Sequence, residues 1–270
     1  MKYFEMLTYY EDELVDANKR MNLNKELSKK AKKNERSASI YKTNAVILSS
    51  SQSIEDINAK VAQDLGYQIA RRQTGGGAVI TRPGSTIQYT LFLEYEQKQE
   101  FFKELAKNTG LSIADHGFLY YENPAKKTIG HAYKILGNGL IQLDGLANLN
   151  ADFVNDAISI IKPRQIYEEG FVKINEEFYT ISGKKIIPTK VNGQELLEES
   201  ELIKNLGYLQ QIGIEEQTFK NSVIKSIQNM GYEINPTQTP NIQTQLLNEG
   251  KIKGKGHCFV YAPMYFNKNT

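Results

Sequence analysis

Two arginines and three consecutive glycines stand together in the stretch ARRQTGGGAV, residues 70–79. The guanidinium groups of Arg71 and Arg72 can each bind a carboxylate or phosphate through two hydrogen bonds. The glycines permit positive φ and allow a ligand to approach the backbone, whose successive N–H groups can form a concave anion site. The stretch is neither a P-loop nor a G-x-G-x-x-G motif. Its chemistry alone leaves two interpretations open: a simple turn between strands, or a site for an anion or nucleotide.

A second candidate is NPAKKTIGHAYKI, residues 123–135. Lys126 and Lys127 stand just before a predicted strand, where a lysine can reach a phosphate as a point charge. A lysine pair is also typical of an ordinary solvated surface. We predict His131 to be a strand side chain with a local hydrogen bond rather than a base. The three histidines and the single cysteine, Cys258, do not have the spacing of a metal site.

Composition narrows the class of protein. The chain has 270 residues, of which 40% are hydrophobic and 24% charged, as in ordinary globular proteins. A net charge of +2 is too small to create a broad positive potential that would attract nucleic acid or a membrane surface. One cysteine excludes a disulfide framework and favours a reducing compartment. No apolar run approaches the roughly 20 residues of a membrane helix, and acids near the N-terminus argue against a secretory signal. We expect a cytoplasmic protein with neither nucleic-acid nor membrane partners.

Hydrophobic patterns predict alternating groups of helices and strands. Strand 86–95 alternates cleanly, and the GNG between two later strands predicts a hairpin. The predicted helices are 11–36, 53–66, 99–110 and 151–162. The predicted strands are 38–50, 67–72, 78–81, 86–95, 117–123, 129–136 and 140–150. This order predicts an α+β fold with mixed, largely antiparallel sheets packed with helices.

The pattern changes after about residue 163. Residues 171–191 predict a β-hairpin, and 192–213 and 215–234 predict helices. Phe219, Val223, Ile224 and Ile227 give the last helix a stripe that faces a core. We therefore predict a larger domain, 1–187, and a smaller C-terminal α/β accessory region, 188–270.

The run RRQTGGGAV resembles the R-R-x-[ST]-G-G-G-A-V motif of the lipoate–protein ligase A family, within the biotin/lipoate ligase superfamily. Four other segments resemble family segments and occur in the family's order: MNLNKEL (21–27), AVILSSSQSIEDIN (45–58), AKKTIGHA (125–132) and GLIQLDGLANLNAD (139–152). The resemblance extends over about residues 15–165 and implies that 1–187 is a ligase-like catalytic domain.

The resemblance implies an enzyme that uses ATP and Mg²⁺ to convert lipoate or octanoate into an acyl-adenylate. It then implies transfer of the acyl group to a lysine of a lipoyl domain, in a 2-oxoacid dehydrogenase E2 subunit or the glycine cleavage H protein. Lys127 matches the family's essential lysine and is the expected catalytic residue, and Asp115 is the candidate metal ligand. The residues expected to bind substrate or adenylate are Arg71, Arg72, Thr74, Gly75, Gly76, Gly77, Ala78, Lys126, Gly130 and Ala132.

Four places differ from the family pattern and bear on ATP use. They are Ser49 for Gly, residues 80–82 for Tyr-His-Asp, Asp115-His116 for Asn-Asp, and Asp144-Gly145 for His-Gly. Two alternatives therefore stay open. One is an octanoyl or lipoyl transferase that uses no ATP but needs a cysteine nucleophile. The other is a catalytically impaired binding protein with the same fold. Biotin ligation is not expected, because the G-R-G-R-x-G-R type of loop is absent.

Overall fold

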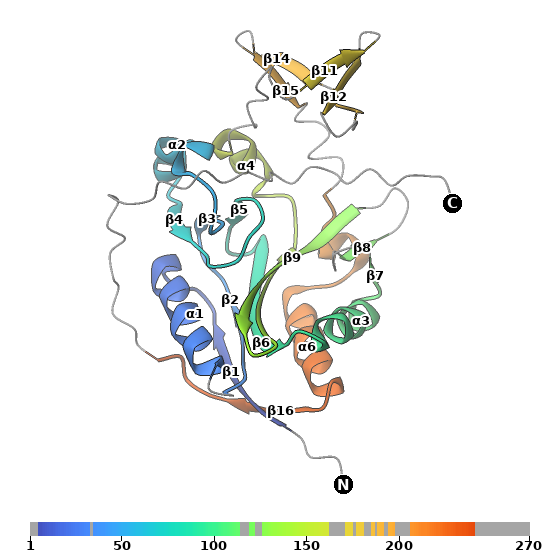
Figure 1. Cartoon of the computed structure of the whole chain (residues 1–270). Helices are drawn as coiled ribbons and strands as arrows, with labels where there is room; N and C mark the ends of the chain where they lie inside the picture. Colours follow the sequence, from blue (N-terminus) through green and yellow to red (C-terminus); the bar gives the residue numbers. More distant parts are fainter. Residues whose placement is uncertain are drawn as a thin grey trace.

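An eight-stranded sheet forms the centre of the molecule, seen in a computed structural model (Figure 1). The strands in spatial order are β16 (Tyr232–Pro236), β1 (Glu5–Asp12), β2 (Ser37–Tyr41), β6 (Thr86–Glu94), β10 (Leu140–Asn148), β9 (Lys126–Gly137), β8 (Leu119–Tyr121) and β7 (Ser112–Ile113). Strand β1 is parallel to both of its neighbours, and the other pairs are antiparallel. The predicted α+β class with mixed sheets is confirmed.

The structure describes residues 5–32, 35–113, 119–121, 126–161, 171–174, 177–180, 185–186, 188–191, 194–197 and 206–240. Within these residues, none of the helices combines the length and the apolar character needed to cross a membrane.

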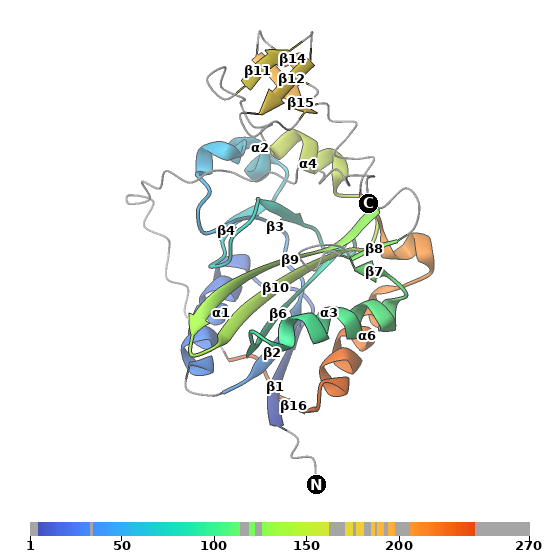
Figure 2. The same cartoon turned by 45° about the vertical axis from the view of Figure 1, so that its right-hand side comes forward.

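Helices α3 (Gln97–Thr109) and α6 (Glu216–Asn229) pack side by side on one face of the sheet (Figure 2). This face is apolar, because every second residue of β6 from Ile87 to Leu93 points into the core that the helices complete. Phe219 of α6 and Phe101 of α3 are fully buried there. Gly110 ends α3 in the left-handed conformation, as the sequence predicted.

Helix α1 (Ala17–Ala31) and a small three-stranded sheet cover the other face. The small sheet has the order β4 (Gln68–Arg71), β3 (Ala45–Leu48) and β5 (Val79–Thr81). Helices α2 (Ala59–Asp64) and α4 (Val154–Ile160) pack against its far side. Strand β6 is consequently buried on both faces, whereas the sequence predicted a half-buried strand.

The predicted helix over 53–66 is wrong as a single element. Ser53 caps a short 3-10 helix, η1 (Ile54–Asp56), through a capping box. Ile57 is then extended and buried, and it pairs with Ile161. Asn58 caps α2 by accepting a hydrogen bond from the N–H of Val61. The buried Ile57 interrupts the helix, because its tertiary contact requires an extended backbone.

The predicted GNG hairpin joins β9 and β10 and is confirmed. Gly137, Asn138 and Gly139 have φ of 98°, 52° and 74°. Asparagine and glycine tolerate this left-handed region better than other residues. The hairpin brings β9 directly beside β10, whose residues pair with it from Ile129 to Gly137.

The later part of the chain adds two small groups of strands. They are β11 (Phe171–Ile174), β12 (Glu177–Thr180) and β13 (Lys185–Ile186) in one sheet, and β14 (Pro188–Val191) with β15 (Gln194–Leu197) in a hairpin. The helix predicted over 192–213 is therefore wrong for Gln194–Leu197, which pair with β14. Among the described residues of this range, a 3-10 turn, η4 (Leu209–Ile212), follows.

Helix α6 is confirmed, but it packs into the main core rather than into a separate region. Phe219, Val223 and Ile227 join the core of the eight-stranded sheet, and β16 extends that sheet beside β1. The division into 1–187 and 188–270 stays a prediction. The structure adds that residues 206–236, beyond that boundary, share the core of the larger unit.

Candidate functional site

The segment 72–78, here called the glycine turn, connects β4 to β5. Gly76 has φ of +94°, and a Cβ there would lie 3.2 Å from Arg72 Nη2. Arg72 is buried, and its Nη2 donates hydrogen bonds of 2.7 Å to the carbonyls of Gly75 and Gly77. Its Nη1 donates to the carbonyl of Ile47 at 3.2 Å. Arg72 thus holds the glycine turn from inside, which explains why an arginine stands next to the glycines.

Arg71 connects the glycine turn to the loop after β3. Its Nη1 donates to the carbonyls of Ser49 and Gln52 at 2.7 and 2.6 Å. The Gln52 side chain accepts from the N–H of Ser49 at 3.0 Å, and the N–H of Ser50 donates to the carbonyl of Thr74 at 3.0 Å. Both guanidinium groups therefore shape the backbone in this structure, while their contact with a ligand stays a prediction. Sequence reasoning did not anticipate these carbonyl partners.

The glycine turn lies against the β9–β10 hairpin. Thr74 Oγ1 donates to Asp144 Oδ2 at 2.6 Å, and Lys134 Nζ donates to Gln73 Oε1 at 3.1 Å. Asp144 of β10 pairs with Ala132 of β9, and paired residues point to the same face of a sheet. The structure therefore brings the two stretches with candidate chemistry together, although they are far apart in the sequence.

Lys127 lies near the start of β9, five residues before Ala132. Five residues of strand span about 16 Å. Its carbonyl accepts a hydrogen bond from the N–H of Gly207 at 2.8 Å, and its side chain is partly exposed. Burial lowers the pKa of Lys127 from 10.5 to about 6. Lys126 begins the strand and is also partly exposed, whereas Gly130, between Lys127 and Ala132, is buried.

His131 points to the opposite, helix-covered face. Its Nε2 shares a hydrogen bond with the hydroxyl of Tyr89, and its ring lies 4.5 Å from the ring of Phe102. The predicted local hydrogen bond of His131 is confirmed. The Tyr89 ring also covers Gly145, where a Cβ would lie 2.1 Å from Tyr89 Cζ. Gly145 is therefore required by packing, because any side chain would collide with Tyr89.

Two predicted residues, Asp115 and Cys258, lie outside the described residues. Within the described residues, no group of three or more His, Cys, Asp or Glu side chains is arranged to hold a metal ion. The sequence marked Asp144 only as a difference from the family pattern, so its contact with Thr74 was missed. A carboxylate in the middle of a mostly apolar strand, residues 140–149, is the signal that was available.

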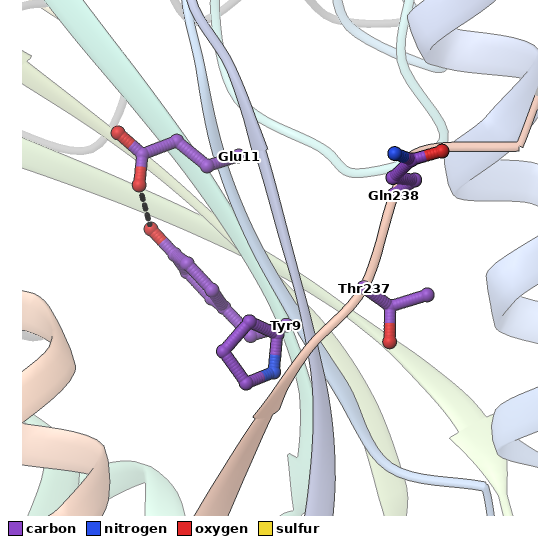
Figure 3. Close-up of a pocket in the computed structure, with 5 residues that line it drawn as sticks. Tyr9, Glu11, Thr237 and Gln238 are labelled. Atoms are coloured by element: carbon purple, nitrogen blue, oxygen red, sulfur yellow. Dashed lines mark hydrogen bonds between the residues drawn. The ribbon is translucent and has the colours of Figure 1, made fainter.

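The molecule also has a surface hollow of about 370 Å³ at the β1–β16 edge (Figure 3). Its lining comprises Tyr9, Glu11, Pro236, Thr237 and Gln238. Tyr9 donates its hydroxyl proton to Glu11 Oε2 at 2.9 Å. Two strands, β2 and β6, separate β1 from β10, so this hollow is distinct from the glycine turn.

The sequence matches no family model and no curated protein. The fold matches solved structures of low sequence identity. A bipartite lipoate protein ligase from Thermoplasma acidophilum, studied with its E2 lipoyl domain, has 13% identity and a TM-score of 0.62, with 88% of each chain covered. A lipoate-protein ligase A bound with ATP has 10% identity and a TM-score of 0.61, with 86% of this chain and 89% of that chain covered.

A third match, from T. acidophilum, is assigned to the lipoate protein ligases and holds lipoic acid. It has 12% identity and a TM-score of 0.60, and 88% of this chain and 90% of that chain are covered. At these identities the likeness concerns the fold, and it agrees with the motifs in the sequence. The chain thus has the fold of these lipoate protein ligases.

Proposed function

We propose that this chain activates lipoate or octanoate with ATP and transfers the acyl group to a lysine of a lipoyl domain. One observation carries the proposal: the hydrogen bond from Thr74 to Asp144 puts the glycine turn over the hairpin whose strand β9 carries Lys127. About 16 Å of strand lies between Ala132 and Lys127, so one extended ligand can contact the turn and the lysine. An acyl-adenylate is such a ligand.

The reaction has two steps. In the first, the carboxylate of the acid attacks the α-phosphate of ATP, and pyrophosphate leaves. In the second, the amine of the acceptor lysine attacks the acyl carbonyl, and AMP leaves. The glycine turn would let the part of the ligand away from the phosphate approach the backbone closely, because glycine has no side chain to block it. Magnesium would enter the site bound to the nucleotide, since Mg²⁺ is usually held by substrate phosphates and one or two carboxylates.

Lys127 has a specific role in this proposal. With a pKa of about 6, its amine is mostly neutral at pH 7 before a ligand binds. A phosphate placed beside it favours the charged form and raises its pKa. Ligand binding would therefore return a proton to Lys127, and the ammonium would stabilise the charge that moves onto AMP during transfer.

The similar solved structures support the choice of ligand and partner. One of those proteins holds ATP, another holds lipoic acid, and a third was studied with its E2 lipoyl domain. We therefore propose the lipoyl domain of a 2-oxoacid dehydrogenase, or the related H protein, as the acceptor.

The test is an assay of the purified chain with lipoate, ATP and MgCl₂. Mass spectrometry should detect lipoyl-adenylate and pyrophosphate, and an added lipoyl domain should gain one lipoyl group. Lys127→Ala should lower the transfer rate about 100- to 1000-fold. Lys107→Ala is the matched control, because Lys107 lies exposed on α3. No adenylate and no lipoylation from the wild-type chain would overturn the proposal.

The same samples separate the alternatives. An ATP-independent transferase should show an acyl adduct on Cys258 in the intact mass. A binding protein should gain thermal stability from lipoate or ATP without turnover, since a ligand stabilises the folded state that binds it.

A further inference from the structure

Asp144 receives hydrogen bonds from three neutral side chains. Thr74 Oγ1 donates to Oδ2 at 2.6 Å, and Thr90 Oγ1 donates to Oδ1 at 2.8 Å. Gln142 Nε2 lies 3.1 Å from both carboxylate oxygens. The three donor side chains are fully buried. They come from the glycine turn, from β6 and from β10, so Asp144 joins three separate elements.

These contacts fill the hydrogen-bond acceptor positions of the Asp144 carboxylate. A carboxylate has about four acceptor positions, and the four contacts to Asp144 occupy them. A metal ion or a ligand group would have to displace one of these donors. The arrangement therefore points to a structural task for Asp144 at the site rather than to direct contact with substrate.

The hydrogen bonds also have a fixed direction. A carboxylate only accepts, so Thr74 and Thr90 each give their single hydroxyl proton to Asp144. Thr90 Oγ1 must then accept from Tyr41 at 3.1 Å and from Asn24 Nδ2 at 3.2 Å. Burial, together with the charge of Asp144, raises the pKa of Tyr41, so Tyr41 keeps the proton that it donates. Every donor in the network points toward Asp144.

We infer that Asp144 is a positioning residue that holds the glycine turn on the β9–β10 hairpin through Thr74. Because Thr74 is fully buried, it acts on the glycine turn through this hydrogen bond and does not itself meet a ligand. The positioning of the turn does not rest on the proposed function.

Hydrogen exchange of the peptide covering 72–79 tests the positioning without any need for activity. Thr74→Val and Asp144→Asn should exchange about tenfold faster there, because the turn loses its attachment to β10. Thr74→Ser keeps the hydroxyl and should match the wild type. Thr109→Val is the matched control, since Thr109 is a buried threonine on the helix-covered side that donates to the carbonyl of Leu105.

Unchanged exchange of residues 72–79 in both Thr74→Val and Asp144→Asn overturns the inference. If Asp144→Asn does not fold, Thr74→Val decides alone, because it leaves the carboxylate and its other two donors in place. Where the wild type forms adenylate, Thr74→Val should raise the KM for ATP more than it lowers kcat, and Thr74→Ser should restore the KM. If the wild type forms no adenylate, the proposed function fails, and the exchange experiment still decides on the turn.

Discussion

The two faces of the central sheet are built from the same strands but differ in chemistry. On the face covered by α3 and α6, β6 presents Ile87, Tyr89, Leu91 and Leu93 to an apolar core. On the other face, the same strand presents Thr90 to Asp144. Successive residues of a strand point to opposite faces, so a strand of alternating apolar and polar residues gives the sheet one apolar face and one polar face. The comparison indicates that the helix-covered face supplies stability, while the other face holds the candidate site.

The site face is polar although it is buried, which requires hydrogen bonds for its polar groups. The network around Asp144 meets this requirement for the threonines. Arg20 of α1 lies within this buried face, with its guanidinium 4.1 Å from the centre of the Tyr41 ring and 3.2 Å from Asp12 Oδ2. Burial lowers the pKa of Arg20, and the nearby Tyr41 and Asp12 oppose this change. A face with such groups suits polar ligand chemistry better than it suits close apolar packing.

The largest expected effect is on the helix-covered face. Phe219→Ala removes a fully buried ring that lies 6.1 Å from the ring of Tyr89. Losing a buried Phe side chain lowers the free energy of unfolding by about 3–5 kcal/mol. Urea unfolding measures this, and the activity per folded molecule should stay near the wild-type value. Phe219→Leu should cost less, and a loss below about 1 kcal/mol for Phe219→Ala would contradict the assignment of stability to this face.

The second effect tests the contact between β6 and β10 on the helix-covered face. Gly145→Ala puts a Cβ 2.1 Å from Tyr89 Cζ, and such overpacking costs about 1–3 kcal/mol. The double variant with Tyr89→Leu should recover part of that loss, because the smaller side chain leaves room for the methyl group. Thermal unfolding of the single and double variants gives the coupling. Purely additive losses would show that the Tyr89 ring is not the obstacle.

The third effect concerns Lys127 of β9, the expected catalytic residue. Lys127 has a pKa of about 6 in the folded chain, below its ordinary value of 10.5, so folding disfavours its charged form. Between these two pH values the unfolded chain binds more protons than the folded chain. The resulting loss of folding stability is complete below about pH 6 and disappears as the pH rises toward 10.5. Lys127→Met should therefore raise stability, on the order of 1 kcal/mol at pH 7, while it lowers transfer as Lys127→Ala does.

The pH dependence of that variant provides its check. The difference in melting temperature between Lys127→Met and wild type should be larger at pH 6 than at pH 9, because the wild type gains stability across this range. A difference that does not change with pH would mean that Lys127 keeps its charge in the folded chain. Lys107→Met, an exposed change, controls for the general effect of losing one lysine.

The smallest effect concerns an ion cluster that belongs to neither face. Lys220 of α6 lies 3.0 Å from Glu11, 2.8 Å from Glu13 and 3.2 Å from Glu216. Lys220 is buried, but Glu11 and Glu13 are well exposed, so water screens these ion pairs. Lys220→Met keeps an apolar side chain in the buried position and should therefore cost less than about 1 kcal/mol at pH 7. Hydrogen bonds from Lys220 and Lys42 lower the pKa of Glu13 from 4.5 to about 2.

Because the pKa of Glu13 is lowered, its contribution is present above pH 4.5 and is lost as the pH falls toward 2. Melting temperatures at pH 6 and pH 3 measure this loss. The difference between wild type and Lys220→Met should shrink at pH 3, where Glu13 begins to take up its proton. An equal difference at both values would show that the cluster does not act through Glu13.

Local signals predicted the elements whose form depends on nearby residues. Helices α3 and α6 and the β9–β10 hairpin follow from residue spacing and from glycines. Long-range contacts were not predictable in this way. The pairing of β16 with β1 joins residues near the two ends of the described chain, and the burial of Ile57 against Ile161 divides a predicted helix. Both contacts depend on residues far away in the sequence, which a local pattern cannot identify.

The sequence by itself determined which residues could form a site and which family motif they resemble. Residue types and order were enough for this, because arginines, consecutive glycines and a lysine before a strand limit the possible chemistry. Only the tertiary structure decided what each side chain contacts. Arg71 and Arg72 bind carbonyls, and Thr74 finds Asp144 on a distant strand. Hydrogen bonds depend on distances and directions in space, and these are set only when α1, the small sheet and the central sheet pack together.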